Sequence, residues 1–395
     1  MRLKIKCLSS GWLLIAAMAI SSACREAELG PVRTLKDGLE IVENGNGIYP
    51  EKGEPRTLSL REEFRIDLED GSLAEAGLTD VDTLDVDSHG RIYLFRRQAI
   101  SGNIVFKFDE RGRLLGSFCA IGQGPGEVQS PRFMRMTPGD EIPVINMGNR
   151  AVVFFDTEGK VIRKTALPAV FLPLPRGIIP LATGDYLVSY FRVKPETLEF
   201  SEFGVGVFSA DFTKRLELRI YPVPGENDLR TPFYDFPLVA ASDKAIFIAS
   251  MAPKRDIEVY DLGGRLIRKI LADYPAVKVP SEFREEFLSP IPRDHPLWKN
   301  LVFPGTFPPF KSLFTDDLGR LYAAGYAKDP RTGANVCDVF SPSGVRILRT
   351  AMGYQTLQHL HPLDAVIKNG RLYCVREKPG GFLEVLVFSL QWTVD

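Results

Sequence analysis

The residues that could carry chemistry are few, and the most prominent group is a glycine-rich stretch, "GSFCAIGQGPGEVQSPRF", from Gly116 to Phe133. Glycine-rich loops bind phosphate in two settings. A Walker loop needs Gly-Lys-Ser/Thr ahead of a helix, and a dinucleotide fingerprint needs a βαβ unit. The sequence around this stretch offers neither context. It therefore predicts a turn between sheets and not a nucleotide site.

Histidine and cysteine residues offer little further chemistry. His359 and His361 share one face of a strand, but zinc sites need three or four protein ligands and no third ligand stands nearby. Apart from Cys7 and Cys24, the cysteines show no C-x-x-C spacing; they are Cys119, Cys337 and Cys374. No G-x-S-x-G elbow is present for acyl transfer. We expect no metal, no cofactor and no catalytic residue, and at least one unpaired, buried thiol.

The composition is that of a packed soluble protein. The chain has 395 residues, of which 45% are hydrophobic and 25% are charged, and its formal net charge is −1. No block of lysine and arginine appears that would attract a polyanion. We therefore do not expect a nucleic-acid partner.

The N-terminus is organised as an export signal. Basic side chains within residues 2–6 precede an apolar run at 12–20 and small residues at 21–23. The apolar run is too short to span a bilayer. The order of these segments predicts a signal peptide over residues 1–23.

Cys24 follows the small residues directly. The sequence "SSAC" resembles a bacterial lipobox, whose cysteine becomes lipidated, although Ser21 stands where that pattern has leucine. Free secretion after Ala23 is the alternative. The chain is expected to be exported, either lipid-anchored at the periplasmic or outer membrane or secreted. Residues 24–55 are rich in Gly, Pro and charge and are predicted to be a tether, so any membrane contact would be through the lipid anchor alone.

A repeat organises the rest of the chain. One unit is a tight polar turn followed by an apolar strand, as in "DSHGRIYLF" (87–95) and "DDLGRLYAA" (316–324). A second unit follows it, as in "VFKFDERGRLLGSF" (105–118), with an aromatic residue heading a second turn. The six aromatic markers are Phe108, Phe155, Phe208, Tyr260, Phe340 and Phe388. Their spacing fits one four-stranded sheet per repeat.

These repeats predict an all-β fold, a six-bladed β-propeller with four-stranded antiparallel blades, over residues 56–395. The last repeat ends on its third strand near Trp392. The segment 56–68 is therefore expected to supply the missing outer strand and close the ring. A long insertion, 273–310, separates the fourth and fifth repeats.

The stretch "GQGPGEVQSPRFM", together with the F-D-x-x-G-K/R turns, resembles six-bladed propellers of the NHL-repeat and TolB-like kind. Exported bacterial lipoproteins are common among them. The resemblance covers roughly residues 56–395, although later repeats lack the GPGE loop. It also implies an alternative activity, because calcium-dependent lactonases and related hydrolases are built on six-bladed propellers.

Loop lengths indicate which end of the propeller binds. First-to-second and third-to-fourth connections are tight, whereas the long connections are second-to-third or between blades: 96–103, 119–131, 191–205, 221–236, 273–310 and 325–336. Antiparallel order places the long connections at one end. Binding residues concentrate in elaborated loops on rigid scaffolds, so this end is expected to bind.

At that end, the starts of the first strands carry polar side chains. Arg132, Arg176 and Lys311 are cations that suggest an anionic ligand such as a carboxylate, a sugar acid or a phosphate. Neighbouring candidates are Tyr234, Asp235 and His361, with Asp80 or Asp82 also near an entrance. Ion pairing among these groups to hold the ring together is the structural alternative.

The insertion carries aromatic residues expected to cover the rim. Phe283 and Phe287 lie on one side of a short helical segment at i,i+4, and Trp298 is a candidate anchor. Such a segment is predicted to pack across the rim as a flap or to act as a lid.

The predicted function is a non-catalytic binding module of the bacterial cell envelope, whose partner is an envelope protein, an anionic small molecule or a glycan. A permanent structural subunit of an envelope complex is a related reading. The alternative is a metal-dependent hydrolase of the lactonase kind.

Overall fold

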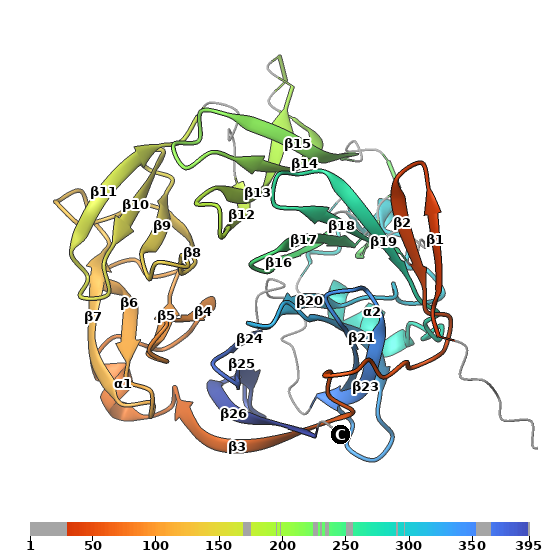
Figure 1. The fold of residues 1–395 in the computed structure, drawn as a ribbon. Helices are drawn as coiled ribbons and strands as arrows, with labels where there is room; N and C mark the ends of the chain where they lie inside the picture. Colours follow the sequence, from red (N-terminus) through yellow and green to blue (C-terminus); the bar gives the residue numbers. More distant parts are fainter. Residues whose placement is uncertain are drawn as a thin grey trace, which may run out of the picture.

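The computed structural model describes residues 30–168, 175–194, 196–197, 199–223, 228–229, 231–233, 237–249, 256–289, 291–295, 297–352 and 365–393. Six blades, each built on four antiparallel strands, form a ring around a central opening (Figure 1). The prediction of a six-bladed β-propeller is therefore confirmed.

Each blade runs from an innermost strand at the central opening to an outer strand at the rim. In chain order, the strands of the first three blades are β4 (Thr83–Val86), β5 (Ile92–Phe95), β6 (Asn103–Phe108) and β7 (Leu114–Ala120); β8 (Pro131–Met134), β9 (Ile142–Asn146), β10 (Ala151–Phe155) and β11 (Val161–Ala166); and β12 (Pro175–Pro180), β13 (Tyr186–Val193), β14 (Phe200–Phe208) and β15 (Arg215–Pro222). Those of the last three are β16 (Leu238–Ala241), β17 (Ala245–Ala249), β18 (Asp256–Asp261) and β19 (Leu266–Leu271); β20 (Ser312–Thr315), β21 (Leu321–Lys328), β22 (Asn335–Phe340) and β23 (Arg346–Met352); and β24 (Ala365–Lys368), β25 (Arg371–Glu377) and β26 (Leu383–Thr393), completed by β3 (Thr57–Asp67).

The ring closes as the sequence predicted. Strand β3 pairs antiparallel with β26, with a register that runs from Thr57 opposite Thr393 to Asp67 opposite Glu384. The sixth blade thus takes its outer strand from the start of the propeller (Figure 1). Pairing the two ends of the domain removes two unpaired strand edges at once.

An aspartate fixes many of the tight turns. The Asp109 carboxylate accepts the backbone N–H groups of Arg111 at 3.0 Å and Arg113 at 2.8 Å, and Gly112 takes a φ of 81°. Aspartate favours turns because its side chain satisfies backbone donors two to four residues ahead. The same bonds recur at the turns that begin with Asp87, Asp156 and Asp316. The repeated Asp-x-x-Gly pattern is therefore the local signal that sets the strand pairing.

Glycine in these turns also lets neighbouring blades approach. A Cβ atom on Gly159 would lie 2.6 Å from Cγ of Phe118, which belongs to the outer strand of the preceding blade. A Cβ atom on Gly112 would lie 2.8 Å from the ring of Phe64 in β3. Both distances are well below ordinary contact, about 3.5–4.0 Å between carbon atoms. Glycine at these two positions is thus required by packing as well as by φ.

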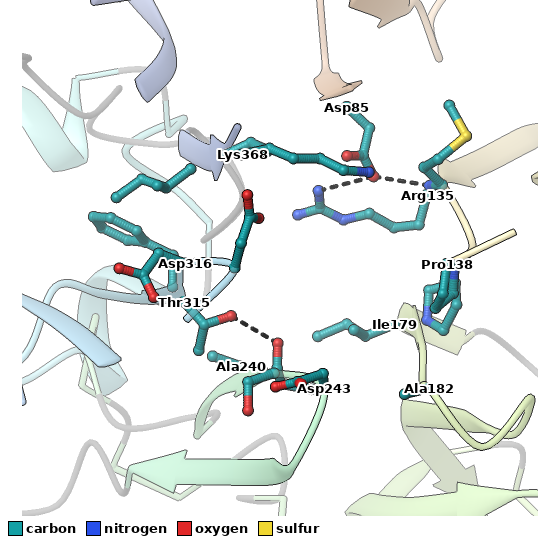
Figure 2. A pocket seen from close by; sticks show the side chains of 18 of the residues that line it. Asp85, Arg135, Pro138, Ile179, Ala182, Ala240, Asp243, Thr315, Asp316 and Lys368 are labelled. Atoms are coloured by element: carbon teal, nitrogen blue, oxygen red, sulfur yellow. Dashed lines mark hydrogen bonds and ion pairs between the residues drawn. The ribbon is translucent and has the colours of Figure 1, made fainter. Parts of the chain in front are cut away.

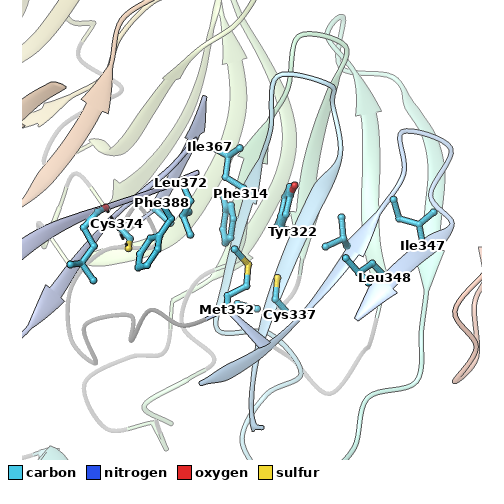
Figure 3. Close-up of a cluster of buried hydrophobic side chains, with 14 of the residues drawn as sticks. Phe314, Tyr322, Cys337, Ile347, Leu348, Met352, Ile367, Leu372, Cys374 and Phe388 are labelled. Carbon is cyan, nitrogen blue, oxygen red and sulfur yellow. Dashed lines mark hydrogen bonds between the residues drawn. The ribbon is translucent and has the colours of Figure 1, made fainter. Parts of the chain in front are cut away.

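The core lies between blades. Figure 3 shows the cluster between blades five and six, where Phe314 stacks on Tyr322 with ring centroids 5.1 Å apart and Cys337 and Cys374 fill the space around them. All six aromatic markers of the repeat are buried. Five of them end or nearly end the third strands, and Phe388 is in the middle of the long strand β26. The register shifts at or near the markers, which increases the local strand twist.

The sequence predicted at least one unpaired, buried thiol, and the described part of the structure has three. Cys119, Cys337 and Cys374 are all free, and burial raises the pKa of Cys119 and Cys337. They behave as small hydrophobic side chains in the core.

The predicted tether over 24–55 does not hold for residues 30–55. Strands β1 (Val32–Lys36) and β2 (Leu39–Glu43) form a hairpin, and β2 pairs in parallel with β19 at the rim of blade four (Figure 1). Glycine and charge in this segment shape a turn and ion pairs: Gly38 has a φ of 79°, and Glu40 pairs with Arg268 at 2.6 Å. The composition was therefore read wrongly as that of a linker. Residues 24–29 and the predicted signal peptide, 1–23, lie outside the described residues.

A buried arginine fixes the end of this hairpin. The guanidinium of Arg346, which is fully buried, donates to the carbonyl groups of Gly45 at 2.6 Å and Gly47 at 2.8 Å and pairs with Asp338 at 3.0 Å. The Asn44 side chain accepts the backbone N–H of Arg346 at 2.7 Å. The N-terminal segment is thus part of the folded domain.

Three short helices complete the described structure. α1 (Gly71–Glu75) lies between β3 and β4 and is capped by Asp70, whose carboxylate accepts the N–H of Ser72 at 2.9 Å. α2 (Ser281–Leu288) and α3 (Leu297–Asn300) lie in the insertion between β19 and β20. Within the described part of the chain, no helix has the length and apolar character to span a bilayer.

Candidate binding site at the central channel

The central channel has two different ends. The innermost strands β4, β8, β12, β16, β20 and β24 surround the opening (Figure 1) and run in the same direction, because each follows a blade-to-blade connection. Their starts define what we name the long-loop end, with the connections 68–82, 121–130, 167–174, 223–237, 272–311 and 353–364. Their ends meet the first-to-second turns, and we name this the turn end.

The predicted difference in loop length is present, with one correction. Second-to-third connections are shorter than expected: 191–205 reduces to 194–199 and 325–336 to 329–334. The reason is that β13, β14 and β21 extend beyond the ring as long strands. The elaboration at the long-loop end is thus mainly in the blade-to-blade connections.

Three arginines converge at the long-loop end. Arg132 is in β8, Arg176 is in β12, and Arg97 follows β5. The pKa of Arg176 is lowered, first by burial and then by the positive charges of Arg97 and Arg132. The side chain of Arg176 is nevertheless exposed to solvent. Arg132 and Arg176 are thus close enough for their charges to interact. We name Arg97, Arg132 and Arg176 the arginine cluster.

Arg97 was not among the sequence-based candidates. It pairs with Asp82, whose carboxylate accepts its backbone N–H at 2.5 Å and lies 3.3 Å from its Nε atom. Burial raises the pKa of Asp82, although the contacts with Arg97 act in the opposite direction. Asp80 pairs with Arg96 at 2.8 Å. The available signal in the sequence was that Arg96 and Arg97 begin the connection 96–102, which lies at the long-loop end.

The remaining predicted ligand-binding residues divide into two groups. Lys311 directly precedes β20, is half-buried, and donates its backbone N–H to Ala324 at 2.7 Å. Its position is at the long-loop end. Tyr234, Asp235 and His361 lie outside the described residues.

The predicted lid residues take part in an aromatic cluster. Phe283 packs against Phe233 and Phe307 with ring centroids 5.4 and 5.1 Å apart, and Phe287 lies 5.8 Å from Phe303. Phe307 in turn stacks on Tyr326 of blade five at 4.2 Å. Such stacking adds to the apolar contact that holds the insertion against the ring.

Trp298 has a different role from the one expected of an anchor to the ring. Its indole N–H donates to the carbonyl of Ile291 at 3.2 Å, and both residues belong to the insertion. It therefore stabilises the insertion internally.

A cavity of about 320 Å³ lies at the turn end of the channel (Figure 2). Asp85, Arg135 and Lys368 lie on one side of it, and Asp243 lies on the opposite side. The sequence analysis did not point to this end. Among the described residues, no three His, Cys, Asp or Glu side chains gather as a metal site would require.

The chain matches no model of a known protein family and no curated protein sequence. Its fold is similar to that of a protein named as exported from Bacteroides fragilis, with 10% identity, a TM-score of 0.51, and 89% of this chain and 99% of that chain covered. A member of the DUF4221 family from Bacteroides vulgatus gives 11% identity, a TM-score of 0.49, and coverage of 86% and 100%. A gluconolactonase from Xanthomonas campestris gives 13%, 0.41, and coverage of 88% and 98%. The first similarity supports the propeller fold alone.

Proposed function

We propose that this chain is a non-catalytic binding propeller of the bacterial cell envelope, and that it takes an anionic ligand at the long-loop end. The observation that carries the proposal is the arginine cluster, in which the charges of Arg97 and Arg132 act on Arg176 at the long-loop end. A guanidinium presents several N–H donors in a plane, which suits carboxylate and phosphate groups. The ligand class is therefore a carboxylate, a sugar acid or a phosphate, free or displayed on a glycan or an envelope protein.

The electrostatics of the arginine cluster favour an anion. The pKa of Arg176 is lowered because burial and two like charges disfavour its charged form. A bound anion offsets the repulsion among the three guanidinium groups. The loss of this repulsion contributes to the binding free energy of the anion. The guanidinium of Arg176 lies 5.8 Å from the centre of the Phe191 ring, a contact that helps orient it.

Binding is favoured over metal-dependent hydrolysis by the same charges. A calcium-dependent hydrolase needs several oxygen ligands converging on the ion. Two carboxylates at this end are engaged by arginines, Asp82 by Arg97 and Asp80 by Arg96. The neighbouring guanidinium groups would also repel a divalent cation. Stoichiometric calcium binding together with lactone hydrolysis would support the hydrolase instead.

The cell-envelope location is supported by the N-terminal sequence. The order of basic, apolar and small residues before Cys24 is that of an export signal, and "SSAC" resembles a lipobox. The related propellers would then be those of the NHL-repeat and TolB-like kind. Mass spectrometry of the mature N-terminus tests this part. A diacylated Cys24 is expected, and a mature chain that retains residues 1–23 would contradict export.

The ligand proposal is tested by calorimetric titration with citrate, glucuronate and inorganic phosphate. The double variant R132Q/R176Q is expected to weaken binding of the best of these anions by about tenfold or more, since a hydrogen bond to a charged group contributes about 1.5–3 kcal/mol. The matched control is R111Q. Arg111 is 75% exposed in the β6–β7 turn at the opposite end, so its loss should leave binding unchanged. Equal binding by R132Q/R176Q and the wild type would refute the proposal that the arginine cluster binds the anion.

A further inference from the structure

The cavity at the turn end of the channel is formed by all six blades. Its walls are apolar where the innermost strands face each other, with Ile179, Val239, Leu313 and Val366 among the lining side chains. Its volume of about 320 Å³ is at the lower end of the range for small-molecule sites, about 300–1,000 Å³. The turns that close the first strands supply its charged groups.

One side of the cavity carries cations. Arg135, which follows β8, contacts Asp85 through a single ion pair of 3.5 Å, while Asp85 also accepts the backbone N–H of Met136 at 2.8 Å. Lys368, at the end of β24, donates to the carbonyl of Val86 at 2.8 Å. Among the described residues no carboxylate forms an ion pair with Lys368. The ammonium group and most donors of the Arg135 guanidinium are therefore available to a ligand.

The opposite side carries a carboxylate. Asp243 lies in the turn after β16, and Figure 2 shows it across the opening from Arg135 and Lys368. Within the described structure Asp243 has no cationic partner in an ion pair. A second carboxylate, Asp317, is on the Lys368 side, because it accepts the backbone N–H of Asn369 at 2.6 Å. Burial raises the pKa of Asp317, although the N–H of Asn369 and the charge of Lys368 act in the opposite direction.

Asp316 also lines the cavity but is engaged elsewhere. It accepts the hydroxyl of Tyr322 at 3.0 Å and pairs with Arg320 at 3.3 Å. The groups left for a ligand are thus Arg135 and Lys368 on one side and Asp243 on the other.

We propose that this cavity binds a small zwitterion with an apolar body, of the size of an amino acid or a dipeptide. Its carboxylate would lie toward Arg135 and Lys368, its ammonium group toward Asp243, and its apolar part against Ile179 and Leu313. A simple anion would be repelled by Asp243, and a simple cation would be repelled by Lys368 and Arg135. Only a molecule with both charges is complementary to both sides.

The charge requirement is tested with four related probes in calorimetric titrations: L-leucine, the dipeptide Leu-Leu, N-acetyl-L-leucine and L-leucinamide. The last two lack the ammonium and the carboxylate group, respectively. Leucine or the dipeptide is expected to bind at least about tenfold more tightly than both blocked compounds. Whether leucine or the dipeptide binds more tightly then indicates the distance between the positively and negatively charged sides of the cavity. Failure of both zwitterions to bind, or equal binding of the blocked compounds, would overturn the proposal.

Two variants test which charged group of the ligand binds at each side of the cavity. Asp243→Asn should weaken leucine binding about tenfold and leave N-acetyl-leucine unaffected, whereas Lys368→Met should weaken leucine and leave leucinamide unaffected. The control is Asp185→Asn, because Asp185 lies in the corresponding turn of blade three but does not line the cavity. Thermal unfolding confirms that each variant is folded. An equal loss in Asp185→Asn would overturn the proposal, and so would loss of leucine binding in R132Q/R176Q, which alters only the other end of the channel.

Discussion

Replacing glycine at the contacts between blades tests how closely the sheets pack. In Gly159→Ala the new methyl group meets Cβ and Cγ of Phe118 at 2.7 and 2.6 Å. These atoms are next to the backbone of β7 and cannot swing aside, so the strand itself has to move. In Gly184→Ala the φ is almost the same, 86° against 81°, but no atom lies within 4 Å. Comparing the two variants therefore separates the free-energy cost of the close contact from the free-energy cost of the backbone conformation.

The magnitudes follow from these two terms. A residue other than glycine in the left-handed region costs about 1–2 kcal/mol, and this cost is common to both variants. Overpacking adds about 1–3 kcal/mol in Gly159→Ala alone. We expect a loss of about 2–5 kcal/mol for Gly159→Ala and about 1–2 kcal/mol for Gly184→Ala. Gly112→Ala should fall between them, because it meets ring atoms of Phe64, which have more freedom to shift.

Urea denaturation followed by fluorescence measures the series. The midpoints should decrease in the order Gly184→Ala, Gly112→Ala, Gly159→Ala with an unchanged slope, which shows that the loss is in the folded state. If Gly159→Ala is no less stable than Gly184→Ala, the reasoning that blade contact requires glycine at this turn is wrong.

Three further predictions concern the N-terminal hairpin, a rim carboxylate and the thiols. Asn44→Ala leaves the buried N–H of Arg346 and the carbonyl of Gly344 without their partner. We therefore expect the free energy of unfolding to fall by about 2–4 kcal/mol and amide hydrogen exchange over residues 32–43 to become faster. Unchanged exchange over these residues would contradict the prediction. Burial pushes the pKa of Glu258 upward, but hydrogen bonds from Arg219 and Tyr260 outweigh it and leave the pKa below the usual 4.5. The stabilisation by this carboxylate is therefore present above pH 4.5 and lost as the pH falls through the folded-state pKa. Glu258→Gln should lower the free energy of unfolding by about 2 kcal/mol at neutral pH and by little in strong acid. Thermal unfolding of the variant and the wild type at both pH values measures this difference. Ellman's reagent should label Cys119, Cys337 and Cys374 only after unfolding, and labelling of the native protein would show that these side chains are accessible.

The parts of the fold that the sequence predicted well are those fixed by local signals. An aspartate such as Asp109 satisfies the backbone of its own turn, and a marker such as Phe108 ends its own strand, so the repeat is visible without knowledge of distant residues. Closure by β3 followed from counting, because the last repeat lacked one strand. The hairpin at 32–43 was missed because its partners lie far away in the sequence: Glu40 pairs with Arg268, and Asn44 bonds to Arg346.

The candidate sites were predictable only in part, for the same reason. Arg132 and Arg176 occupy equivalent positions in successive repeats, so the periodicity places them at one opening. Arg97 lies in a connection whose path the repeat does not determine. The cavity at the turn end depends on which turn residues of six blades carry positive or negative charge, and Asp243 and Lys368 belong to turns that are far apart in sequence. Only the closed ring sets these charges opposite each other.

The pairing of β2 with β19 determines where the polypeptide leaves the disc. The chain emerges at Gly30 from the periphery of blade four, a quite different place from the seam where β3 closes the sixth blade. An attachment ahead of Gly30 would therefore hold the propeller by its rim and away from the central channel. Both openings of the channel would then stay accessible to solutes at the same time.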